Sequence, residues 1–142
     1  MIVLTNISDS RLSVAEHLAA VASAESGATA LFLGTVRDHD PEATGTVVTL
    51  EYSAHPDAAA TLARLAAEAD GPGLRIAVSH RIGSLSVGEE AIVCAVSSAH
   101  RADAFEVSRA LVERVKAELP VWKKQVEVDG TASWVGLGSL AT

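Results

Sequence analysis

The chain has 142 residues, 49% of them hydrophobic, and a formal net charge of −7. We predict a single domain, 1–142, that buries roughly two-thirds of its unfolded surface, and the apolar content argues against disorder. The acidic balance excludes general binding to nucleic acid or to anionic membranes, because both need an extended basic face.

The N-terminal part is predicted to be a strand followed by a helix. Residues 2–7 alternate loosely between apolar and polar and indicate a strand. This stretch has no basic flank and is too short for a signal peptide or a membrane span, so we expect a cytoplasmic protein. Ser13 and Glu16 have the spacing of a capping box, which predicts a helix that runs to about Ser26 and ends at Gly27.

Two β-rich stretches, 28–37 and 46–53, follow the first helix. Between them lies the polar, turn-rich loop 38–45, to which the first stretch brings Arg37. We interpret the two stretches as a hairpin with a long loop.

Asp38, His39 and Asp40 in that loop are residue types that bind metals. No second cluster with ligand spacing accompanies them, so we expect solvated side chains, no metal and no other cofactor.

The middle of the chain combines a helix with two more strands. Residues 55–70 are rich in alanine and predict a helix that ends at the Gly-Pro-Gly stretch 71–73. Residues 74–82 and 90–98 predict strands, joined by a turn at 83–88 that contains two glycines.

Two features of these strands are assigned structural roles. Cys94 has apolar neighbours and is expected to be a buried, unreactive thiol. His80 and Arg81 lie near the end of the first strand, where we expect packing or a backbone hydrogen bond and not catalysis, so both are left out of the site.

A long helix from His100 to Leu119 is ended by Pro120. Its apolar positions recur every four residues and predict a core-facing stripe, with Lys116 on the flank of that stripe. These positions are Val107, Leu111, Val115 and Leu119.

A hairpin closes the chain before a short tail. Asp129-Gly130 lies between the strand-like stretches 123–128 and 131–135 and is a strong turn signal. The tail, 136–142, shows no catalytic group. Strands mixed with helices indicate an α+β domain with a mostly antiparallel sheet covered by helices and an additional C-terminal β-hairpin.

All three lysines lie within nine residues of this acidic chain, from Lys116 to Lys124, which predicts an anion site. His100 and Arg101 open the long helix, where free N–H groups and the helix dipole also favour an anion. The sixteen residues from His100 to Lys116 span about 24 Å as a helix, too far for one small substrate. We therefore hypothesise that two copies of the chain share each site.

Six basic side chains suit a phosphorylated small substrate. They are Arg37, His100, Arg101, Lys116, Lys123 and Lys124. Crowding by cations favours the neutral, nucleophilic form of a lysine, and Lys116 is the candidate for that role. A solvated Lys116 paired with Glu113 or Glu118 remains the alternative.

Short motifs in order over nearly the whole chain resemble those of one family. They are Phe32-Leu-Gly-Thr-Val-Arg37, Leu50-Glu-Tyr52, His80-Arg-Ile-Gly83, Ser98-Ala-His-Arg101, Ala104-Phe-Glu106, Lys116 and Pro120-Val-Trp-Lys-Lys124. Each motif alone is weak, but the ordered set is specific. It resembles the large, catalytic subunit of molybdopterin synthase.

The resemblance implies an α/β-hammerhead fold and a sulfurtransferase of molybdenum cofactor biosynthesis. Such an enzyme converts cyclic pyranopterin monophosphate to molybdopterin by placing two sulfurs on adjacent carbons as a dithiolene. The sulfur comes from the thiocarboxylate on the C-terminal Gly-Gly of a small ubiquitin-like partner. This chain ends without Gly-Gly, so we expect the sulfur carrier to be a separate polypeptide. The implied assembly is a homodimer of large subunits within a heterotetramer.

The resemblance also implies the roles of individual residues. Lys116 and Lys123 are the implied catalytic residues. The implied substrate-binding residues are Thr35, Val36, Arg37, His100, Arg101, Lys124 and Gln125. The family commonly has Glu at the last position, and Gln125 hydrogen-bonds without serving as a carboxylate. The alternative function is a non-catalytic dimeric module that binds a phosphorylated metabolite or an acidic partner tail.

Overall fold

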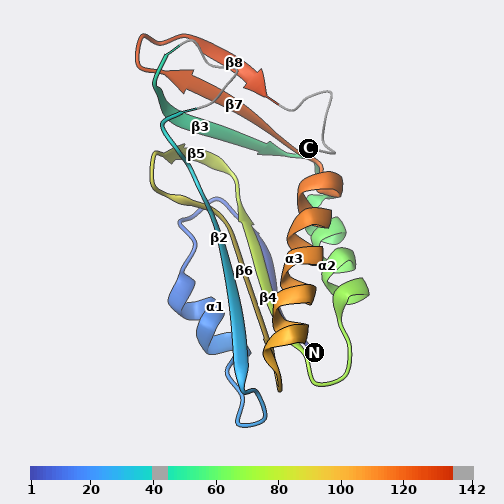
Figure 1. The fold of residues 1–142 in the computed structure, drawn as a ribbon. Coiled ribbons are helices and arrows are strands. Elements are labelled where there is room, and N and C mark those ends of the chain that lie inside the picture. Colours follow the sequence, from blue (N-terminus) through green and yellow to red (C-terminus); the bar gives the residue numbers. More distant parts are fainter. Residues whose placement is uncertain (40–44, 136–142) are drawn as a thin grey trace.

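The computed structural model describes residues 1–39 and 45–135 (Figure 1). These residues form an α+β fold, as predicted. The elements in chain order are β1 (Ile2–Ser8), α1 (Val14–Val21), β2 (Ala28–Thr35), β3 (Val47–Ala54), α2 (Ala58–Ala69), β4 (Arg75–Arg81), β5 (Gly83–Ser86), β6 (Glu90–Ser98), α3 (Arg101–Glu118), β7 (Val121–Glu127) and β8 (Ala132–Val135).

A first sheet with strand order β1-β4-β6-β2 has helices on both faces. Figure 1 shows α2 and α3 side by side on one face and α1 on the other. Alternate residues of the central strand β4 point to the two sides: Ile76 and Val78 pack with α2 and α3, while Ala77 packs with Val21 of α1. The pairing is antiparallel except between β1 and β4, which are parallel.

A second sheet, with strand order β5-β3-β7-β8, lies beyond the end of α3 (Figure 1). All of its pairs are antiparallel, which confirms the mostly antiparallel expectation. The predicted C-terminal hairpin is its β7–β8 pair. Gly130 has a φ of +87°, the left-handed conformation for which this turn needs glycine.

The interpretation of 28–37 and 46–53 as one hairpin is wrong. β2 pairs with β6 along its length, whereas β3 pairs with β5 and β7 in the other sheet. Local patterns identified both strands but not their partners, because partners are chosen by which faces become buried together. The stretch 83–88, predicted as a turn, contains the short strand β5, which pairs with β3.

The first helix begins as predicted and ends early. Glu16 N–H donates to Ser13 Oγ at 3.1 Å, so Ser13 is the N-cap. The helix stops at Val21 and not at Ser26, because Ala22 is already extended (φ −64°, ψ 134°). The remaining residues turn toward Gly27, where an added Cβ would lie 2.6 Å from the Ala99 carbonyl oxygen.

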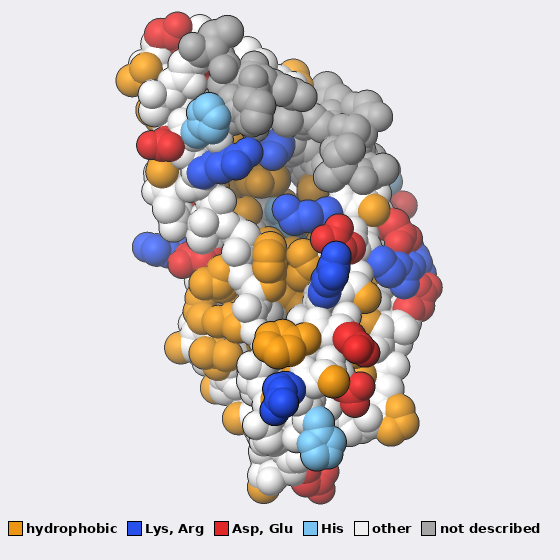
Figure 2. Space-filling model, in the orientation of Figure 1, with side chains coloured by type: hydrophobic (Ala, Val, Ile, Leu, Met, Phe, Trp, Pro, Cys, Tyr) orange, Lys and Arg blue, Asp and Glu red, His pale blue; other side chains and the backbone are white. Residues whose placement is uncertain are grey.

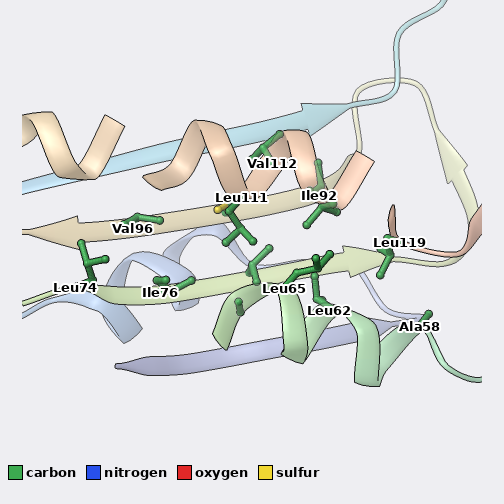
Figure 3. Close-up of a cluster of buried hydrophobic side chains, with 14 residues drawn as sticks. Ala58, Leu62, Leu65, Leu74, Ile76, Ile92, Val96, Leu111, Val112 and Leu119 are labelled. Carbon is green, nitrogen blue, oxygen red and sulfur yellow. The ribbon is translucent and has the colours of Figure 1, made fainter. Parts of the chain in front are cut away.

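The main core lies between the first sheet and the pair α2 and α3 (Figure 3). The predicted stripe of α3 faces it: Leu111, Val115 and Leu119 are buried, and Val107 is partly buried against the same cluster. This packing fixes the orientation of α3 about its axis. Lys116 is therefore held on an exposed flank, as predicted.

No helix within the described residues has the length and apolar character needed to cross a membrane.

Candidate functional site

Lys116 lies in the last turn of α3, where the helix meets the second sheet. Pro120 follows, and its carbonyl accepts a hydrogen bond from His55 N–H at 3.0 Å. Val121 N–H bonds the Leu119 carbonyl at 2.8 Å, so the chain passes directly from α3 into β7. Lys116 is thereby placed close to the strand that carries the other two lysines.

Lys123 and Lys124 of β7 have different surroundings. Lys123 is the cross-strand partner of Tyr52 on β3, while Lys124 is the partner of Glu51. Tyr52 packs against the second core cluster, so Lys123 lies on the inner side of the sheet. Lys124 lies on the opposite side, with its Nζ 3.8 Å from Glu51 Oε2 and 5.9 Å from the ring centroid of Trp134.

The rings of Tyr52 and His80 meet edge to face, with centroids 5.1 Å apart and an interplanar angle of 73°. Burial raises the pKa of Tyr52 to about 12 and keeps its hydroxyl protonated. His80 is buried, and its pKa is lowered to about 4, chiefly by burial and further by the positive charge of Lys116. Tyr52, His80, Lys116 and Lys123 thus belong to one junction between α3 and the two sheets.

Arg37 is positioned by the residue before it. A register shift between Gly34 and Thr35 marks the end of the β2–β6 pairing. Val36 N–H donates to the Glu89 carbonyl at 3.0 Å, and the Val36 carbonyl accepts from Gly88 N–H at 2.7 Å. The Val36 side chain is 3% exposed and packs in the second core cluster. Val36 therefore anchors the chain and leaves Arg37 exposed beside it, like Thr35.

Gln125 lies two residues beyond Lys123 on the same side of β7 and is 1% exposed. Its Nε2 donates to Ser133 Oγ at 3.4 Å. Its Oε1 is buried and, within the described part of the chain, has no hydrogen-bond partner. The residue is part of the inner layer of the second sheet and offers an unused acceptor there.

His100 and Arg101 lie at the opposite end of α3 from Lys116. The helix has 18 residues, which corresponds to about 27 Å. Both side chains are exposed. Figure 2 shows Lys and Arg side chains spread along one face, from the second sheet down over α3, and not gathered into a single cluster. One copy of the chain therefore has Lys116 and Lys123 at the same end of α3 and His100 and Arg101 at the other end.

The family model for MoaE protein matches residues 7–118 of the chain. The chain belongs to the MoaE family. A molybdopterin synthase catalytic subunit 1 from Mycobacterium tuberculosis is 41% identical over 133 residues, which is 92% of this chain and 88% of that relative.

Solved structures agree with this membership. The crystal structure of molybdopterin synthase from Staphylococcus aureus has a TM-score of 0.84 and 32% sequence identity, covering 92% of this chain and 95% of its own. A complex of subunits 1 and 2 of molybdopterin-converting factor from Helicobacter pylori has a TM-score of 0.77 over 95% of this chain and 92% of its own. At 20% identity, that second likeness concerns the fold alone.

Two residues of the junction, Tyr52 and His80, were not among the predicted site residues. His80 was expected to pack or to bond the backbone, which is confirmed: its Nδ1 lies 2.7 Å from the Arg81 carbonyl oxygen. The available signal was its spacing, because His80 continues the alternation of Ile76 and Val78 on the helix-covered face.

Arg81, Asp38 and His39 have other surroundings. The Arg81 guanidinium is 12% exposed, pairs with Glu89 and donates to the Ser84 carbonyl at 3.4 Å. Asp38 and His39 are exposed, and Asp40 lies outside the described residues. Among the residues that the structure describes, no group of three or more His, Cys, Asp or Glu has the arrangement of a metal site.

Proposed function

We propose that this chain is the catalytic subunit of a molybdopterin synthase, a sulfurtransferase that makes the molybdopterin dithiolene from cyclic pyranopterin monophosphate. The observation that carries the proposal is its place in the MoaE family, whose model spans residues 7–118 and whose relative in Mycobacterium tuberculosis is a molybdopterin synthase catalytic subunit. The junction supports it, because Lys116 at the end of α3 and Lys123 on β7 both neighbour the Tyr52–His80 pair, and a lysine amine can act as an acid, a base or a nucleophile.

In the proposed reaction, a small ubiquitin-like partner brings its C-terminal Gly-Gly thiocarboxylate to this junction. The thiocarboxylate sulfur attacks an oxygen-bearing carbon of the pterin precursor. A C–S bond forms while the C–O bond at that carbon breaks, the oxygen leaving on the phosphate or as water, and the partner is left joined through a thioester. Water then cleaves the acyl–sulfur bond, so the partner leaves as a carboxylate and the sulfur stays on the pterin. Two such transfers to adjacent carbons make the dithiolene.

Lys116 and Lys123 act on the negative charges of these steps. An ammonium or amine placed beside the thioester stabilises the developing oxyanion or moves a proton to it. The buried Cys94 takes no part, because burial raises the pKa of its thiol to about 12 and leaves it protonated.

The phosphate of the precursor requires further cations. Arg37 is exposed beside the second sheet, and His100 and Arg101 are exposed at the far end of α3. A second copy of the chain, arranged antiparallel along α3, supplies its His100 and Arg101 to the Lys116 of the first copy. Thr35, Val36, Lys124 and Gln125 remain proposed substrate contacts, and the main-chain hydrogen bonds of Val36 to Gly88 and Glu89 hold its neighbours Thr35 and Arg37 in place.

The proposed assembly is a homodimer of this chain with one small subunit at each end, in the cytoplasm. Exposed apolar side chains support contact with another chain, because large exposed apolar patches are uncommon on monomers. They include Leu31 and Leu33 on the edge strand β2, 40% and 38% exposed, and Phe105 on α3, 65% exposed. Figure 2 shows hydrophobic side chains gathered over β2 and α3.

A sulfur-transfer assay tests the reaction. The chain is mixed with a thiocarboxylated ubiquitin-like protein and cyclic pyranopterin monophosphate, and the mass of the pterin product is measured by mass spectrometry. We expect two sulfurs in the product with the wild-type chain and none with Lys116→Ala. Glu113→Ala, an exposed change on the same helix, is the matched control and retains turnover. Binding of precursor without turnover by the wild type would support the binding-module alternative instead.

Mixing two inactive variants tests the shared site. If Lys116 of one copy works with Arg101 of the other, a dimer of Lys116→Ala and Arg101→Ala chains has one intact site. An equal mixture of the two chains, re-associated at random, then regains about a quarter of the wild-type activity. A mixture no more active than either variant alone would contradict sharing.

A further inference from the structure

His80 is the one polar residue of β4 that faces the helix pair. Ile76 and Val78 precede it on that face and pack against Leu111, Val112 and Val115 of α3 within the main cluster. Ser79, between Val78 and His80, faces the other side of the sheet, where its Oγ lies 2.7 Å from Nε2 of His17 on α1. His80 therefore continues an apolar series toward the C-terminal end of α3, where Lys116 lies.

The hydrogen bond of the ring decides its tautomer. The Arg81 carbonyl oxygen, 2.7 Å from Nδ1, is an acceptor only, so Nδ1 carries the proton and donates. The ring is neutral at neutral pH because burial lowers its pKa to about 4. Nε2 consequently bears a lone pair and is able to accept one hydrogen bond.

Charged and titratable groups approach this ring from each neighbouring element. Tyr52 of β3 contributes its ring edge and a protonated hydroxyl, and the cross-strand partner of Tyr52 is Lys123 of β7. The positive charge of Lys116 on α3 helps to lower the pKa of His80. On its own strand, the Arg81 guanidinium is turned to Glu89. The donors on these neighbouring elements are the Tyr52 hydroxyl and the amines of Lys116 and Lys123, and Lys116 is the one whose charge acts on His80.

We propose that His80 is a positioning residue for sulfur transfer: held by the Arg81 carbonyl and the Tyr52 ring, it presents its Nε2 lone pair to the Lys116 amine and orients that amine toward the substrate. The inference rests on the proposed function of Lys116. A neutral imidazole suits the task, because a charged one would repel the lysine. His80 is held rigidly at the end of β4, so its Nε2 fixes the direction of the Lys116 amine. The flexible four-carbon side chain of lysine does not fix that direction alone.

Two substitutions separate positioning from packing. His80→Phe keeps the ring volume and the contact with Tyr52 but removes the acceptor. His80→Gln loses the ring but places an amide near the former Nε2. We expect kcat for sulfur transfer to fall about ten- to a hundredfold in His80→Phe, with little change in KM, and to recover partly in His80→Gln. If His80 only packs, the order reverses and activity follows thermal stability, which overturns the proposal.

A second measurement does not depend on turnover. The titration of His80 is followed by NMR in the wild type and in two charge-removing variants. Lys116→Gln is expected to raise the pKa of His80, while Arg109→Gln, two turns earlier on α3, leaves it unchanged. An unchanged His80 titration in Lys116→Gln overturns the pairing. If the wild type shows no sulfur transfer, the proposed function fails and this measurement still decides whether the two side chains are coupled.

Discussion

Lys123 and Lys124 are consecutive in the sequence and face opposite sides of the second sheet. The first is the cross-strand partner of Tyr52, whose ring contacts His80, and the second is paired with Glu51 beside Trp134. The alternation of a strand makes this separation unavoidable. Lys123, predicted to be catalytic, and Lys124, predicted to bind substrate, thus have different access to the junction around Lys116.

The separation predicts unequal effects of the two lysines. Lys123→Ala is expected to lower kcat for sulfur transfer by about a hundredfold or more, as for loss of a group that acts on the transition state. Lys124→Ala is expected to lower it by much less and to act mainly on KM. Steady-state kinetics of both variants with thiocarboxylated partner measure this. Equal losses in kcat would contradict the assignment of faces.

The depressed pKa of His80 predicts a loss of stability in mild acid. In the unfolded chain His80 takes up a proton near pH 6.5, whereas in the folded chain it does so only near pH 4. Between these values the unfolded state binds the extra proton, so the free energy of unfolding falls as pH falls. The contribution amounts to about 2 kcal/mol between pH 7.5 and pH 5.

Denaturant unfolding of the wild type and of His80→Phe at both pH values checks this. The variant lacks the titrating group and is expected to lose correspondingly less stability over the same interval. The same acid sensitivity in both proteins would show that His80 is not the group responsible.

Gly34 leaves room for a neighbouring side chain at the end of β2. A Cβ at this position would lie 2.4 Å from Cγ2 of Ile92, the cross-strand partner of both Gly34 and His80. Ile92 is branched at Cβ and packs under α3, so it has little freedom to move. Gly34→Ala is expected to destabilise the fold by about 1–3 kcal/mol, measured by denaturant unfolding. Thr29→Ala on the same strand is exposed and serves as the control, with a change below about 0.5 kcal/mol.

Cys94 is predicted to be dispensable for chemistry. It is fully buried on β6, and burial raises its pKa to about 12. Cys94→Ala is expected to keep sulfur transfer within about twofold of the wild type once a modest loss of stability of about 1 kcal/mol is allowed for. Mass spectrometry after iodoacetamide treatment should show no alkylation of the folded protein and complete alkylation after unfolding. Rapid alkylation of the folded chain would contradict the buried assignment.

Local patterns in the sequence predicted the elements well wherever the signal was itself local. The helix start at Ser13, the stop at Pro120 and the Asp129-Gly130 turn each concern a few neighbouring residues, and the structure confirms all three. The family was likewise identified from short motifs in order. The early end of α1 was missed, because residues 22–26 lack a strong break and Gly27 is the first clear stop signal in the sequence.

The sequence by itself determined that this acidic chain has three lysines in one short stretch, that Lys116 lies beside a core-facing stripe, and which family the chain belongs to. Only the tertiary structure decided that β2 and β3 belong to two different sheets and that Lys123 and Lys124 face opposite sides of one sheet. It also decided that Tyr52 and His80 lie at the same junction as Lys116. The physical reason is that strand partners are set by the burial of shared faces between residues far apart in the chain. The direction in which a side chain points has chemical meaning only once those partners are in place.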